Sequence, residues 1–271
     1  MEIFLITNEE IQTYISSIPP SPNVLKKVLT RIEEGELTKA ANEAAQDPAL
    51  KAYLQSVVNK PIYSFKNDIK DIGQIFGVLG LAQAEQLIYN YMISLLSPKK
   101  WELFSLTNKE FTNIQDSLSV QWKKILEYKG ISDKTLFSAI SLLPASIIVC
   151  EALFKSKKQE IELIRSAKEI DYSTILKRLT NMSLFDLCQS IATAWELPSI
   201  VSKIVLASSG HSDETDKQII ELSKWMHLLF FYQLSQAICV EAGLNDFIEF
   251  NIDYVSDIYE EFQDLIMEEN A

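Results

Sequence analysis

The sequence predicts an all-α protein built as a multi-helix bundle. Its 271 residues include only seven Gly and eight Pro, fewer than the turns of a β-rich protein of this length usually need. Hydrophobic residues make up 47% of the chain and charged residues 23%, so a large core can be buried. Apolar positions recur three and four residues apart along most of the chain, which is the spacing of amphipathic helices.

Three helices are predicted before residue 47. The first begins at Asn8 and stops at Pro19, because proline cannot continue a helix. The second ends at Gly35, a residue that readily adopts the left-handed conformation of a helix terminus. A short Ala-rich helix follows over residues 37–46.

The fourth helix has the clearest start signal. Asp47 can accept hydrogen bonds from the first free amides, and Pro48 suits the first helical position. Residues 60–68 read as a loop. Two strongly apolar helices, 69–80 and 81–96, then form the predicted centre of the first half.

The second half is predicted to contain five or six more helices. Their ends are indicated by residues that interrupt helices, near Gly130, Pro144, Pro198, Gly210 and Gly243. The last helix is expected to be the most regular, with an apolar face from Ile252 to Ile266. Its outer face is acidic, and from Glu241 to the end the chain has ten Asp or Glu and no Lys or Arg. Such a face is usually a solvated surface, and the alternative is docking of a basic partner.

Residues 136–154 are apolar and nearly long enough to span a bilayer. The central Pro144, several serines and Glu151 favour a buried helix of a soluble core instead. The N-terminus lacks the basic and apolar regions of a signal peptide. We therefore expect a cytoplasmic protein without a membrane partner.

Charge and cysteine usage narrow the function classes. The formal net charge of −12 disfavours nucleic acid and anionic membranes as partners, because both attract clustered Lys and Arg. Cys150, Cys188 and Cys239 lie far apart in apolar surroundings. They are expected to be buried small side chains in a reducing compartment, not nucleophiles.

Familiar catalytic motifs are missing from the sequence. There is no Gly-rich phosphate loop, GxSxG, HExxH, EF-hand loop or zinc-type spacing. Only two histidines are present. His227 lies in an apolar helix and is expected to be a core residue with one hydrogen-bond partner. His211 follows Gly210 in a turn, where Ser212, Asp213 or Thr215 can cap the next helix.

Several short motifs of the first half occur in a characteristic order. They are Ile18-Pro19-Pro20-Ser21-Pro22, Gln46-Asp47-Pro48-Ala49-Leu50, Asn59 with Tyr63, Ile69 with Ile72, and Leu79-Gly80. In order and spacing they resemble the opening of the HDOD domain, the HD-related output domain of bacterial signalling proteins. The second half resembles the family more loosely, through Trp195-x-Leu197-Pro198.

The resemblance also shows where metal ligands are expected in HD-type phosphohydrolases. In those enzymes His and Asp hold metal ions that activate water for attack on a phosphoester. In this chain the His-Asp pair falls on Leu143 and Pro144, another His near Leu184, and a His-His pair near Ser208 and Ser209. Leu and Pro cannot ligate a metal, and Ser is a poor ligand. The resemblance therefore implies no catalytic residue, no metal and no cofactor.

The fold implied by the resemblance is HD-domain-like, with two closely packed helical subdomains, residues 1–110 and 111–271. The implied function is that of a non-catalytic HDOD-type signalling or regulatory protein, in bacterial motility or signal transduction. It would act through an unidentified protein partner. The expected contact is the apolar seam between the halves or the acidic C-terminal helix.

Two alternatives remain at this stage. The first is a metal-dependent phosphodiesterase with substituted ligands, for which the candidates are Asp116, Asp186, His211 and Asp213. The second is a receptor that binds a nucleotide in the residual HD cleft without hydrolysing it.

Overall fold

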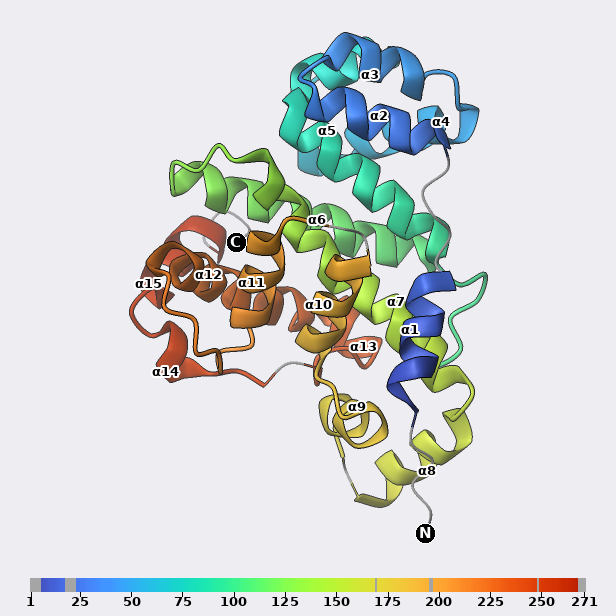
Figure 1. The fold of residues 1–271 in the computed structure, drawn as a ribbon, viewed down its shortest axis with the longest axis vertical. Coiled ribbons are helices and arrows are strands. Elements are labelled where there is room, and N and C mark those ends of the chain that lie inside the picture. The colour runs from blue at the N-terminus through green and yellow to red at the C-terminus, as the bar shows by residue number, and fades with distance from the viewer. Residues whose placement is uncertain (1–5, 18–22, 169, 195–196, 248, 268–271) are drawn as a thin grey trace. The chain divides into compact units, whose positions relative to one another are not determined.

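The structure is a computed structural model that describes residues 6–17, 23–168, 170–194, 197–247 and 249–267. Within these ranges it consists of helices and connecting loops, with no β-strand (Figure 1). The predicted all-α fold class is thus confirmed.

The chain forms two compact units, each assembled from segments that are distant in sequence. Unit 1 comprises Met1–Ile18, Ser97–Ile114 and Leu142–Ala271, and unit 2 comprises Pro19–Leu96 and Gln115–Ser141. The chain therefore passes from one unit to the other after residues 18, 96, 114 and 141. The predicted subdomains had a single boundary at residue 110, so the units divide the chain differently.

Unit 2 is built mainly from the first half of the chain. Its elements are α2 (Asn23–Glu33), α3 (Leu37–Ala44), α4 (Pro48–Val58), the short 3₁₀ helix η1 (Pro61–Tyr63), α5 (Ile72–Leu96), the 3₁₀ helix η2 (Lys134–Ser141), and α6 (Asn108–Tyr128) from residue 115 onward. Helices α2, α3 and α4 each pack on α5 (Figure 1). Their shared core includes Leu25, Leu54 and Phe76, all with no exposed surface.

Local signals in the sequence account for the helix ends of unit 2. The carboxylate of Asp47 accepts hydrogen bonds from the amides of Ala49 (2.8 Å) and Leu50 (3.1 Å), so it caps α4 as predicted. Gly35 ends α2 with a φ of +78°, which glycine adopts without strain. At Gly80 the backbone leaves helical geometry (φ 73°, ψ 174°), which divides α5 at the predicted boundary between two helices.

Unit 1 contains the remaining helices. They are α1 (Asn8–Ser17), α7 (Leu142–Lys155), α8 (Lys158–Lys168), α9 (Tyr172–Thr180), α10 (Leu184–Ala194), α11 (Ser199–Ala207), α12 (Lys217–Leu234), α13 (Ala237–Glu241), α14 (Ile252–Val255), α15 (Tyr259–Phe262) and the π-helical turn η3 (Gln263–Met267). Helix α7 packs on α10, α10 on α11, and α11 on α12. The first three of these helices, α7, α10 and α11, carry the positions at which the resemblance places the HD-type metal ligands.

The apolar segment 136–154 is a core segment, as predicted. It forms η2 followed by α7, and not a single α-helix. Thr135–Lys155 is long and apolar enough to cross a membrane, yet 94% of its most apolar stretch is buried inside the protein. Pro144 lies in the first turn of α7, where its missing amide hydrogen is not needed.

The predicted regular helix at the C-terminus is wrong. The segment is divided into α14, α15 and η3. The break lies at Ile258, which leaves helical geometry (φ −119°, ψ 2°) while its side chain stays buried. Ile252 was placed on the apolar face, but it is 51% exposed. The apolar residues Val255, Ile258 and Phe262 are nevertheless buried, as the spacing pattern predicts.

Candidate functional site

The positions of the HD-type metal ligands lie on α7, on α10 and at the end of α11. Leu143 and Pro144 are in the first turn of α7, Leu184 opens α10, and Ser208 is the C-terminal cap of α11. All four residues are buried. Helix α10 packs on both α7 and α11, and the side chains at the expected positions are apolar apart from Ser208 and Ser209.

The polar atoms at these positions already have partners. The hydroxyl of Ser208 donates to the carbonyl of Val205 (2.6 Å), and that of Ser146 donates to the carbonyl of Leu143 (2.7 Å). The thiol of Cys188 donates to the carbonyl of Leu142 (3.4 Å). Burial raises the pKa of this thiol to about 12, so it stays protonated. Ser208 and Ser146 bond within their own helices, and Cys188 joins α10 to α7, so these groups already have partners within the protein.

His227 is a buried neutral histidine with two partners. Its Nδ1 lies 2.8 Å from the carbonyl oxygen of Ser208, so Nδ1 carries the hydrogen. Its Nε2 accepts a hydrogen bond from the backbone amide of Asn251 (3.2 Å). Burial lowers the pKa of His227, because the charged form loses its hydration. The prediction of a core histidine is confirmed, and the second partner comes from a distant segment.

His211 and Asp213 lie on an exposed loop after Gly210. The amide of His211 donates to the hydroxyl of Ser209 (3.3 Å). The predicted caps of the following helix, Ser212, Asp213 or Thr215, are wrong. The cap of α12 is Asp216, whose carboxylate accepts from the amides of Gln218 and Ile219, because the helix starts only at Lys217.

The other two candidate metal ligands, Asp186 and Asp116, already have partners within their own units. Asp186 accepts from the amide and the hydroxyl of Ser183 and so stabilises the start of α10. Asp116 belongs to unit 2, where its carboxylate pairs with the ammonium group of Lys60. Among the described residues, no group of three or more His, Cys, Asp or Glu could hold a metal ion. The residues present therefore do not fit an HD-type metal centre.

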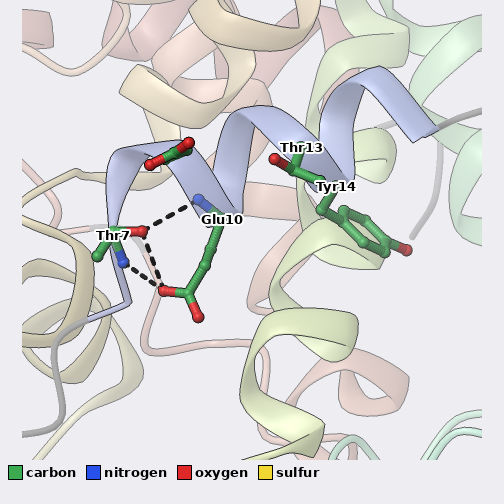
Figure 2. A pocket seen from close by; sticks show the side chains of 5 residues that line it. Thr7, Glu10, Thr13 and Tyr14 are labelled. Carbon is green, nitrogen blue, oxygen red and sulfur yellow. Dashed lines mark hydrogen bonds between the residues drawn. The ribbon is translucent and has the colours of Figure 1, made fainter.

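A surface pocket lies beside α1 and is lined by Thr7, Glu9, Glu10, Thr13 and Tyr14 (Figure 2). The carboxylate of Glu10 accepts from the amide of Thr7 (2.7 Å), and the hydroxyl of Thr7 accepts from the amide of Glu10 (3.1 Å). This is a capping box, and its hydrogen bonds lower the pKa of Glu10. Two of the polar residues of this pocket, Thr7 and Glu10, therefore serve to start α1.

A buried polar network in unit 2 was missed by the sequence analysis. Asn90 on α5 is its centre. Its amide donates to the hydroxyl of Ser119 on α6 (2.8 Å), and its side-chain oxygen accepts from the hydroxyl of Ser141 on η2 (3.1 Å). Gln86 donates to the same Ser141 hydroxyl. The available signal was the pair Gln86 and Asn90, one helical turn apart in a strongly apolar segment.

A second polar cluster of unit 2 surrounds Asp116. The side chain of Asp116 is only 2% exposed, and its Oδ2 lies 2.5 Å from Nζ of Lys60. Burial raises the pKa of Asp116 to about 6, against the lowering effect of Lys60. The hydroxyl groups of Tyr53 and Tyr63 are also buried, and the negative charge of Asp116 adds to the rise of both phenol pKa values. The carboxylate of Asp116 therefore pairs with Lys60 and acts through its charge on both tyrosine hydroxyls.

Comparisons with known proteins agree with the fold. The family model of the HDOD domain matches residues 18–210. A solved HDOD domain protein of unknown function from Geobacter sulfurreducens aligns with 95% of this chain and 85% of its own, at 18% identity and a TM-score of 0.65. A Shewanella amazonensis SB2B protein with the provisional name metal-dependent phosphohydrolase aligns with 95% of both chains, at 16% identity and a TM-score of 0.52. A search of curated proteins finds no significant match.

Proposed function

Because this chain belongs to the HDOD domain family, we propose that it is a non-catalytic regulatory protein that acts in bacterial signalling by binding another protein. One observation carries the proposal. The expected metal-ligand positions hold Leu143, Pro144, Leu184, Ser208 and Ser209, and all of these except Ser209 are buried. Side chains of this kind cannot bind the ions that HD-type hydrolysis requires.

The nearby histidine supports the same proposal. Both ring nitrogens of His227 are used, one by the carbonyl of Ser208 and the other by the amide of Asn251. A metal at either nitrogen would leave a buried backbone group without its partner, which is costly. Similarity to the phosphohydrolase of Shewanella shows a shared fold at 16% identity, and a shared fold does not carry its chemistry over.

The catalytic alternative can be tested directly. Untagged protein prepared without chelators is analysed by elemental mass spectrometry, and the same sample is assayed for hydrolysis of a phosphodiester with added Mn²⁺. We expect less than about a tenth of a metal ion per chain and no hydrolysis above background, because an HD-type site needs bound metal. Near-stoichiometric metal together with hydrolysis would refute the proposal.

The acidic C-terminal segment, residues 241–271, is the surface that we propose for partner binding. Asp253, Glu260 and Asp264 are exposed in it. Asp257 is already paired with Lys224 (2.6 Å). A segment with ten acidic and no basic residues attracts a basic partner over a distance, and this attraction weakens with salt.

A charge-neutralising variant tests this surface. Asp253→Asn, Glu260→Gln and Asp264→Asn are combined in the full chain, and proteins retained from a bacterial lysate are compared by quantitative mass spectrometry. We expect one partner, captured at low salt by the wild type, to fall several-fold for the variant. The matched control neutralises three exposed acids elsewhere, Asp68, Glu160 and Asp213, and should retain the partner. Equal losses in both variants would contradict the proposed surface.

A further inference from the structure

The cluster around Asp116 holds polar atoms that lack hydrogen-bond partners. The hydroxyl oxygens of Tyr53 and Tyr63 and Oδ1 of Asp116 are buried, and none of them has a partner among the described residues. Buried polar atoms usually are hydrogen-bonded, since an unsatisfied one costs free energy. These two hydroxyl oxygens and this carboxylate oxygen therefore require an explanation.

The three side chains come from separate elements of unit 2. Tyr53 is on α4, Tyr63 ends η1, and Asp116 is on α6. The charge of Asp116 acts on both phenols, so both hydroxyl groups lie within its electrostatic reach, although neither hydrogen-bonds to it. This arrangement fits one additional hydrogen-bonding group placed between them.

The loop over residues 60–68 borders this cluster, since it carries both Lys60 and Tyr63. Its two ends are joined at Asn59, whose side chain accepts from the amide of Ile69 (2.7 Å) and donates to the carbonyl of the same residue (3.0 Å). Between these two ends, residues 64–68 of the loop are exposed. The Lys60–Asp116 ion pair ties the start of the loop to α6.

We propose that Tyr53, Tyr63 and Asp116 form a buried binding site for one hydroxyl group, and that the loop of residues 60–68 is its cover. A hydroxyl group matches the site because it both donates and accepts. It would donate to Oδ1 of Asp116 and accept from a tyrosine hydroxyl. Three polar partners are also the number that a buried water usually has. The group belongs either to a water molecule or to a small hydroxyl-bearing ligand.

The sign of the stability change on removing each tyrosine hydroxyl tests the site. A hydroxyl that binds the occupant stabilises the protein, whereas an unsatisfied one destabilises it. We expect Tyr53→Phe and Tyr63→Phe each to lower the Tm by about 2–4 °C. The double variant should lose less than the sum, because both hydroxyls share one occupant.

Tyr128→Phe is the matched control, because Tyr128 is in the same unit and 51% exposed. It should change the Tm by less than about 1 °C. If Tyr53→Phe and Tyr63→Phe raise the Tm or leave it unchanged, the binding site is refuted.

Amide hydrogen exchange tests the cover. In Asp116→Asn the ion pair to Lys60 is lost while the side-chain shape is kept. We expect the amides of residues 62–68 to exchange about ten-fold faster, with the centre of α6 unchanged. Lys66→Gln removes an exposed charge from the same loop and should leave these rates as in the wild type. Equal loop rates in Asp116→Asn and the wild type would refute the cover.

The occupant is identified by a high-resolution crystal structure and by native mass spectrometry of dialysed protein. A single isolated peak between the three side chains, with no added mass, identifies water. Continuous density with an added mass identifies a small ligand. A site without density, or tyrosine hydroxyls bonded directly to Asp116, would overturn the proposal.

Discussion

Two buried polar regions, one in each unit, differ in how their hydrogen bonds are completed. Around the former ligand positions of unit 1, His227 and Ser208 satisfy each other and nearby backbone groups. Around Asp116 in unit 2, two tyrosine hydroxyls and a carboxylate oxygen remain without partners. His227 and Ser208, beside the positions that family resemblance marks as a site, are therefore fully paired, whereas the cluster around Asp116 keeps unused hydrogen-bonding capacity.

A second carboxylate shows that the difference does not come from burial alone. Glu151 on α7 is as buried as Asp116, and it accepts hydrogen bonds from the backbone amides of Glu102, Leu103 and Phe104. It anchors that segment within unit 1. Asp116 instead meets side chains that keep unsatisfied atoms. A buried carboxylate thus indicates a binding site only when its surroundings are incomplete.

The largest effect is expected from restoring the missing His-Asp pair. Leu143→His combined with Pro144→Asp places two polar side chains in a closed apolar core. We expect a loss of about 3–5 kcal/mol in the free energy of unfolding, because the new groups have no partners. Urea unfolding and metal analysis measure the outcome. A variant of unchanged stability that binds one metal ion per chain would contradict this expectation and would show that the region can still form a metal site.

The pH dependence of unit 2 is the next largest effect. The pKa of Asp116 is raised from 3.8 to about 6, so the folded state binds its proton more tightly than the unfolded state. Its contribution to stability is therefore present below pH 4 and is lost as the pH rises through 6. The loss is about 2–3 kcal/mol by linkage. Urea unfolding of the wild type and of Asp116→Asn between pH 4 and 7 should show this difference, and parallel curves would contradict it.

Removing the histidine of unit 1 should cost about 2 kcal/mol. His227→Leu keeps an apolar side chain in the core but leaves the carbonyl of Ser208 and the amide of Asn251 without partners. The measurement is the urea midpoint at pH 7.5. A loss below about 0.5 kcal/mol would mean that these hydrogen bonds are not the reason for burying His227.

The same histidine gives unit 1 the opposite pH dependence. Its pKa is lowered below 6.5, so the unfolded state takes up the proton first. Stability is therefore complete above pH 6.5 and falls as the pH drops through the lowered pKa. Comparison of the wild type with His227→Leu from pH 7.5 to 5 isolates this slope. Equal slopes in both proteins would contradict the assignment.

The smallest effect is expected at the other histidine. His211 is exposed, and its hydrogen bond to Ser209 is made by its backbone amide. His211→Ala should change the free energy of unfolding by less than about 0.5 kcal/mol and leave the metal content unchanged. A lower metal content in His211→Ala than in the wild type would indicate that His211 is a metal ligand.

Features encoded in neighbouring residues were predictable from the sequence. The cap at Asp47, the helix end at Gly35 and the division at Gly80 each depend on one or two residues. Features that depend on distant residues were not. Lys60 and Asp116 are 56 positions apart, and His227 meets Asn251 across 24 positions. The break at Ile258 is likewise not revealed by a helical spacing pattern, which gives the burial of Ile258 but not its backbone geometry.

The discontinuous assembly of unit 1 has a consequence for synthesis of the chain. Helix α1 packs on α7 and α10, and the amide of Ile6 donates to the carbonyl of Leu179 (2.7 Å). These partners leave the ribosome long after residues 8–17. Helix α1 is therefore synthesised well before the helices on which it packs, and residues 19–96 of unit 2 are made in between. Ribosome-bound chains that end before α10 should leave the apolar face of α1 open to chaperones.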